Sequence, residues 1–74
     1  MPRFSRYALG RLVQRGISQA DVELVLSDPD TTYPSGTSDR QCYVRDIDER
    51  RIKVVVESSD HDQVVTAYDQ LDNG

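Results

Sequence analysis

Apolar residues in the first part of the chain recur at spacings of three and four, which predicts two amphipathic helices. The first helix is predicted over residues 5–16, with Ser5 as its N-cap and Gly16 as its left-handed C-terminal residue. The second is predicted over residues 18–28, where Ser18 and Asp21 match a variant of the capping box. The apolar face predicted for the first helix contains Phe4, Ala8, Leu9, Leu12 and Val13. The short connection between the two predicts a helical hairpin.

Alternation of polar and apolar residues in the second part of the chain predicts three strands. Residues 29–39 are rich in Pro, Gly, Asp, Ser and Thr, which is typical of a surface loop. Residues 40–69 are predicted to form a three-stranded sheet with hairpin-length connections. The side chains predicted to face the helices are Cys42, Val44, Ile52, Val54 and Val56. The predicted fold is therefore a single α+β domain over residues 1–74, an N-terminal helical hairpin followed by a three-stranded antiparallel β-meander.

Charge is distributed unevenly along the 74 residues, whose formal net charge is −4. Residues 1–15 contain four arginines and no acid, whereas the remainder contains five basic and thirteen acidic side chains. Such a pattern favours a basic surface that meets RNA or an acidic partner protein, although solvated arginines are also ordinary on short helices. The excess of Asp over Glu and of Arg over Lys is typical of proteins from concentrated salt, although a GC-rich genome can also produce part of such a bias.

Several classes of protein are disfavoured by what the sequence contains. The longest apolar run is the three valines at 54–56, and the basic start has no signal-peptide apolar region, so we expect a cytoplasmic protein without a membrane partner. A single cysteine, Cys42, excludes an internal disulfide and a cysteine zinc cluster. The adjacent Asp60, His61 and Asp62 are poorly spaced to converge on one ion. We therefore expect no metal and no cofactor, and a surface role for His61.

The outward face of the predicted sheet offers the candidate chemistry. It would collect Tyr43, Arg45, Arg51, Lys53 and Tyr68. Arginine binds phosphate in a bidentate way, and tyrosine stacks on a base or donates a proton. These properties point to Arg45, Tyr68 and Lys53 as catalytic candidates for metal-free RNA cleavage. Nucleic-acid-binding candidates are Tyr7, Arg11, Arg15 and Arg51, the first three at successive i, i+4 positions. The alternative is an ordinary solvated face with cross-strand ion pairs.

The order of short motifs along nearly the whole chain resembles a known family. The motifs are Tyr7-Ala8, Arg11-Leu12, Arg15-Gly16-Ile17-Ser18, Val22, Leu26, Asp28-Pro29, Tyr43-Val44, Arg51-Ile52-Lys53-Val54-Val55-Val56 and Val64-Val65-Thr66-Ala67-Tyr68. They resemble a family of small prokaryotic domains of unknown function, numbered four-two-five-eight. That family is similar to the BrnT and RelE/ParE toxins, which implies a RelE/BrnT-like fold and either ribonuclease activity or an origin in a toxin–antitoxin pair.

The resemblance also implies which residues would act. RelE-like enzymes place arginine, lysine and tyrosine or histidine on the open sheet face, and Arg45, Arg51, Lys53 and Tyr68 are the candidates by position. Family members usually begin the first helix with His-Ala, whereas this chain has Tyr7-Ala8, and tyrosine titrates only near about 10.

Two functions are expected from these observations. The first is a toxin-related small domain that contacts RNA and pairs with an antitoxin or another protein. The alternative is a non-catalytic protein-interaction module, or one that forms a homodimer through an outer strand of the sheet.

Overall fold

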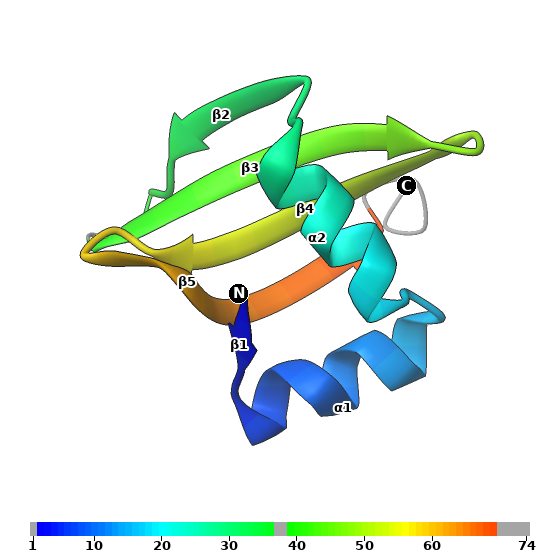
Figure 1. Cartoon of the computed structure of the whole chain (residues 1–74), viewed down its shortest axis with the longest axis horizontal. Helices are drawn as coiled ribbons and strands as arrows, with labels where there is room; N and C mark the ends of the chain where they lie inside the picture. The colour runs from blue at the N-terminus through cyan, green and yellow to red at the C-terminus, as the bar shows by residue number, and fades with distance from the viewer. Residues whose placement is uncertain (1, 37–38, 70–74) are drawn as a thin grey trace.

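The computed structural model describes residues 2–36 and 39–69 and shows one mixed sheet with two helices (Figure 1). The strand order is β1-β5-β4-β3-β2; β1 runs parallel to β5, and the other neighbours are antiparallel. The elements are β1 (Arg3–Phe4), α1 (Arg6–Arg15), α2 (Gln19–Ser27), β2 (Thr31–Pro34), β3 (Arg40–Ile47), β4 (Arg50–Glu57) and β5 (Asp60–Asp69).

The predicted helical hairpin followed by a three-stranded meander is wrong. A strand, β1, precedes α1, and a further strand, β2, lies in the segment predicted to be a loop. Figure 1 shows α2 across β3 and β4, while α1 runs beside β5, so each helix packs on its own part of the sheet. The additional strands escaped prediction because β1 has two residues and β2 is exposed at all four positions, which leaves no alternation to detect. Pro34 is tolerated in β2 because this strand is at the edge of the sheet.

The helix ends follow the predicted caps. The Ser5 side chain accepts a hydrogen bond from the Ala8 N–H at 3.0 Å, and Gly16 ends α1 with a left-handed φ of 63°. At the start of α2, the Ser18 hydroxyl accepts from the Asp21 N–H at 3.0 Å, and the Asp21 carboxylate accepts from the Ser18 N–H at 3.4 Å. The predicted capping box is therefore confirmed.

The main core lies between the two helices and one face of the sheet. Its fully or nearly fully buried members are Ala8, Leu12, Ile17, Val22, Val25, Ile52, Val54, Val56, Val64 and Ala67. Two residues predicted for the buried face of α1 are exposed instead, Leu9 by 39% and Val13 by 82%. Since α1 lies along β5 rather than against α2, only a narrow stripe of the helix is covered.

The face assignment predicted for β3 is inverted. Tyr43 pairs with Val54 and Arg45 with Ile52, so these two side chains share the face that the helices cover. Cys42 and Val44 lie on the opposite face, although both are buried, with exposed fractions of 1% and 2%. The predicted burial of Cys42 is confirmed, and its predicted position facing the helices is wrong. Alternation misassigned β3 because apolar side chains are covered on both of its faces.

Neither helix in the described part of the chain has the length and apolar character needed to cross a membrane.

Candidate functional site

Two tyrosines and one lysine gather on the sheet face opposite the helices. Lys53 of β4 is paired with Tyr68 of β5, and Tyr33 comes from the edge strand β2. The Lys53 Nζ lies 5.2 Å from the centroid of each ring, within the range of cation–π attraction. Cys42 and Val44 share this face and are buried. The three long side chains therefore form an ordered cluster on an apolar part of the sheet.

The ammonium group of Lys53 is held in its charged form. Burial on its own would lower the pKa of Lys53, but hydrogen bonding to the hydroxyls of Tyr68 and Tyr33 outweighs burial and raises that pKa above its ordinary value. Lys53 is consequently a permanent cation at neutral pH, placed between two aromatic rings.

Arg15, the last residue of α1, extends this cluster around the edge of β5. Its guanidinium carbon lies 5.5 Å from the centroid of the Tyr68 ring, and its Nη1 donates to the Ala67 carbonyl oxygen at 3.2 Å. This contact is available because β1 pairs only with Gln63 and Val64, so β1 does not cover Ala67. Arg15 thus takes the place of a neighbouring strand and brings a second cation to Tyr68.

Along α1 the arrangement continues with Arg11 and Tyr7. The Arg11 guanidinium carbon lies 4.9 Å from the centroid of the Tyr7 ring. Arg11 also lies one helical turn from Arg15, at the i, i+4 spacing that places side chains side by side. Tyrosines and cations therefore follow one another from α1 across the sheet, and we call this set the tyrosine–cation stripe: Tyr7, Arg11, Arg15, Tyr68, Lys53 and Tyr33.

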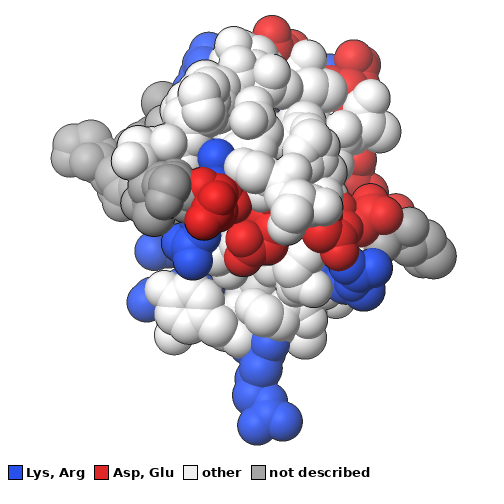
Figure 2. All heavy atoms as spheres, turned by 90° about the vertical axis from the view of Figure 1, so that its left-hand side faces the viewer, with Lys and Arg blue, Asp and Glu red and all other residues white. Residues whose placement is uncertain are grey.

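The cations of the stripe differ from most other basic residues in their electrostatic partners. Within residues 2–36 and 39–69, the ion pairs join Arg3 to Asp60, Arg45 to Asp28 and Asp30, Arg50 to Asp69, and Arg51 to Asp46. None of these pairs involves the three cations of the stripe. The charge of the stripe is therefore not neutralised by a described carboxylate. On the face of the molecule that Figure 2 presents, acidic side chains form a band across the middle, and several basic side chains lie below this band.

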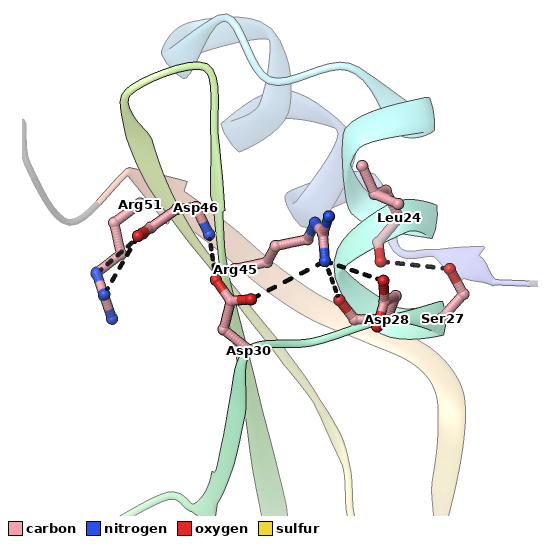
Figure 3. A network of polar contacts seen from close by, with 7 residues as sticks. All are labelled: Leu24, Ser27, Asp28, Asp30, Arg45, Asp46 and Arg51. Carbon is pink, nitrogen blue, oxygen red and sulfur yellow. Dashed lines mark hydrogen bonds and ion pairs between the residues drawn. The ribbon is translucent and has the colours of Figure 1, made fainter.

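Arg45, a predicted catalytic residue, lies elsewhere. Its Nη1 donates to the carbonyl oxygen of Asp28 at 2.6 Å and to the Asp28 carboxylate at 3.1 Å (Figure 3). Asp28 is the C-cap of α2, and Asp30, which lies 4.0 Å from the same Nη1, accepts from the Asp46 N–H. Arg45 thus binds the C-terminal end of α2, where a cation complements the helix dipole, and its charge is offset by two acids.

The other predicted residues divide between the stripe and separate contacts. Lys53, Tyr68, Arg11, Arg15 and Tyr7 belong to the stripe, whereas Arg51 shares the open face but pairs with Asp46 at 3.1 Å.

Tyr43 and His61 contact each other outside the stripe. The hydroxyl of Tyr43 lies 3.0 Å from Nδ1 of His61, on the helix side of the sheet and away from the stripe. Tyr33, which belongs to the stripe, was missed by sequence reasoning because it stands in the segment predicted to be a loop. An aromatic residue next to two threonines, all of them favourable in strands, was the available signal.

Among the described residues, no three His, Cys, Asp or Glu side chains gather to hold a metal ion.

Comparisons with known proteins identify a family but no characterised relative. No curated protein and no solved structure matches the chain. A family described as Domain of unknown function (DUF4258) matches residues 4–69, which includes both helices and nearly all of the sheet. The chain therefore belongs to this DUF4258 family of domains of unknown function.

Proposed function

We propose that this protein binds single-stranded RNA along the tyrosine–cation stripe. The observation that carries the proposal is the alternation of aromatic rings with cations that have no described carboxylate partner. Proteins that bind single strands combine positive charge for the phosphates with aromatic rings for the bases, and the stripe supplies both. The overall charge of −4 weakens long-range attraction to RNA, so binding depends on these local contacts.

Binding is better supported than cleavage. The three predicted catalytic residues do not meet, because Lys53 and Tyr68 lie on the open face while Arg45 caps α2 on the other face. Lys53 and Tyr68 are neighbours, but the pKa of the Lys53 side chain is raised, so its ammonium group stays a cation. Such a group stabilises phosphate charge and is unsuited to accept a proton at neutral pH.

The test is a salt titration of binding to a fluorescent single-stranded oligouridine of about 12 nucleotides, followed by anisotropy. Three neutralised phosphates predict a log–log slope of about −2, since each contributes about −0.7 on a single strand. Lys53→Gln and Arg15→Gln should each reduce the slope by up to about 0.7. Arg6→Gln is the matched control, because Arg6 is an exposed arginine of α1 outside the stripe.

An equal loss on replacing Arg6 would indicate attraction by net charge rather than binding at the stripe. Absence of binding by the unmodified protein at about 50 mM salt, where phosphate contacts are strong, would contradict the proposal. Tighter binding to a DNA strand of equal sequence would replace RNA by DNA as the ligand.

A toxin-related role is the finer form of the same proposal, in which RNA contact leads to growth inhibition. It is supported by the stripe alone. Induced expression in bacteria should slow growth, and Lys53→Gln should relieve the effect while Arg6→Gln does not. Normal growth with the protein accumulated would leave RNA binding without a toxic outcome.

Protein interaction is the second candidate, and one surface favours it. A hollow of about 380 Å³ beside α2 is lined by Pro2, Glu23, Leu24, Leu26, Ser27 and Asp62. Leu24, one of its apolar lining residues, is 39% exposed. Of the outer strands expected to pair in a homodimer, β3 is paired with β2 along residues 41–44, whereas β5 is paired with β1 only at Gln63 and Val64. This function would be favoured if the protein did not bind RNA and if Leu24→Glu weakened its binding to a partner protein.

A further inference from the structure

The three tyrosines of the stripe do not have the same surroundings. Tyr7 and Tyr33 stand at its two ends and are exposed by 59% and 36%. Each is approached by one cation, Arg11 for Tyr7 and Lys53 for Tyr33. Tyr68 lies in the middle, is half-buried, and is approached by two cations, Arg15 at 5.5 Å and Lys53 at 5.2 Å.

We infer, on the basis of the proposed function, that nucleobases stack on the end tyrosines Tyr7 and Tyr33 while phosphates bind at the centre. Tyr68 is then a positioning residue, whose ring and hydroxyl hold Arg15 and Lys53 in place for the phosphates. The ligand this implies is a flexible single strand with bases that are free to turn outward, one near each end of the stripe.

The centre of the stripe is suited to phosphate rather than to a base. Arg15 is fixed by its bond to the Ala67 carbonyl, and Lys53 by its position 5.2 Å from the ring centroids of both Tyr68 and Tyr33. Both cations are therefore ordered before a ligand arrives, which lowers the entropy lost on binding. A base stacking on Tyr68 would compete with two cations for the ring, whereas a base on Tyr7 or Tyr33 would compete with only one.

The experiment compares two probes of equal length, single-stranded oligouridine and the same sugar–phosphate backbone without bases. Binding of Tyr7→Ala, Tyr33→Ala, Tyr68→Leu and Tyr68→Phe is measured with each probe by anisotropy, and circular dichroism checks that each variant is folded. Tyr68→Phe keeps the ring and removes the hydroxyl, so it remains informative if Tyr68→Leu does not fold.

The end tyrosines should matter mainly when bases are present. Tyr7→Ala should weaken oligouridine binding by roughly 5- to 150-fold, with an unchanged salt slope and no effect on the abasic probe. Tyr33→Ala should cause a similar loss with oligouridine and a much smaller loss with the abasic probe, because the Tyr33 ring also contacts Lys53. Tyr68→Leu should weaken binding of both probes by the same factor, and Tyr68→Phe should do so by a smaller factor. A Tyr68 effect confined to the base-bearing probe would overturn the inference, since Tyr68 would then be the stacking surface.

Failure of this inference can be distinguished from failure of the proposed function. If the unmodified protein binds oligouridine and the end tyrosines have no effect, only the assignment of bases and phosphates is wrong. If the unmodified protein binds neither probe, the proposed function itself is contradicted.

Discussion

Arg50 Nε donates a hydrogen bond to the carboxylate of Asp69 at 2.7 Å, and Asp69 is only 4% exposed. The same guanidinium donates to the carbonyl oxygens of Arg15 at 2.9 Å and Gly16 at 3.0 Å. One side chain of β4 thereby joins the end of β5 to the last turn of α1. Because Arg15 belongs to the tyrosine–cation stripe, this contact also fixes the backbone from which Arg15 reaches Tyr68.

We predict that Arg50→Lys destabilises the protein by about 1–3 kcal/mol, because lysine cannot reproduce the planar set of donors that reaches one carboxylate and two carbonyls. A domain of this size has a total stability of only roughly 4–11 kcal/mol, so the effect is large. The measurement is the midpoint of urea unfolding followed by circular dichroism. Arg51→Lys is the control, since Arg51 forms an exposed pair with Asp46 that contributes at most about 1 kcal/mol. Equal midpoints for the two variants would contradict this role of Arg50.

Local signals predicted the helices well because their ends depend on neighbouring residues. Ser5, Gly16 and Ser18 act through contacts no more than five residues away, and these contacts are encoded in short motifs. The arrangement of the sheet depends instead on contacts distant in sequence. The pairing of Arg3 with Gln63 joins positions 60 residues apart, and a strand of two residues is too short to show a sequence pattern that would predict this pairing.

Removing the N-cap of α2 should lower the stability of the protein by a measurable amount. We expect Ser18→Ala to lower the free energy of unfolding by about 1 kcal/mol, because the Asp21 N–H loses its acceptor at the end of the helix. Chemical denaturation gives the value, and Ser59→Ala, at an exposed turn position, is the matched control. A change no larger than that of the control would show that the capping box contributes little here.

The candidate site was only partly predictable for a related reason. Tyr7, Arg11 and Arg15 were grouped correctly because helical spacing alone places them together. The alternation along β3 predicts that Cys42 and Val44 face the helices, which places Arg45 on the open face with Lys53. In the structure Arg45 pairs with Ile52 and lies on the helix-covered face instead. A shift of one residue in the assumed alternation exchanges the two faces of a strand, so every side chain on β3 changed sides together.

The titration of Lys53 tests the electrostatics of the stripe directly. Lys53 is the only lysine, so its side-chain signals in a nuclear magnetic resonance spectrum need no separation from others. We expect its titration midpoint to lie above the ordinary lysine pKa of about 10.4, because the tyrosine hydroxyls outweigh the effect of burial. Replacing both Tyr33 and Tyr68 by Phe should lower the midpoint, since burial then acts without those hydrogen bonds. A midpoint at or below the ordinary value in the unmodified protein would contradict the described environment.

Replacement of Arg45 separates its structural contacts from a direct role in RNA binding. Arg45→Gln removes the cation at the C-terminal end of α2 and leaves Asp28 and Asp30 without it, so we expect a loss of about 1–2 kcal/mol in unfolding free energy. RNA affinity and its salt slope should stay unchanged under conditions where the variant is folded, because Arg45 lies on the opposite face from Lys53. Urea unfolding and the anisotropy titration measure the two effects on the same sample, and Lys53→Gln should show the reverse pattern, with a reduced slope. If Arg45→Gln reduced the salt slope while the protein remained folded, Arg45 would contact the RNA, and the RNA-binding surface would extend beyond the stripe.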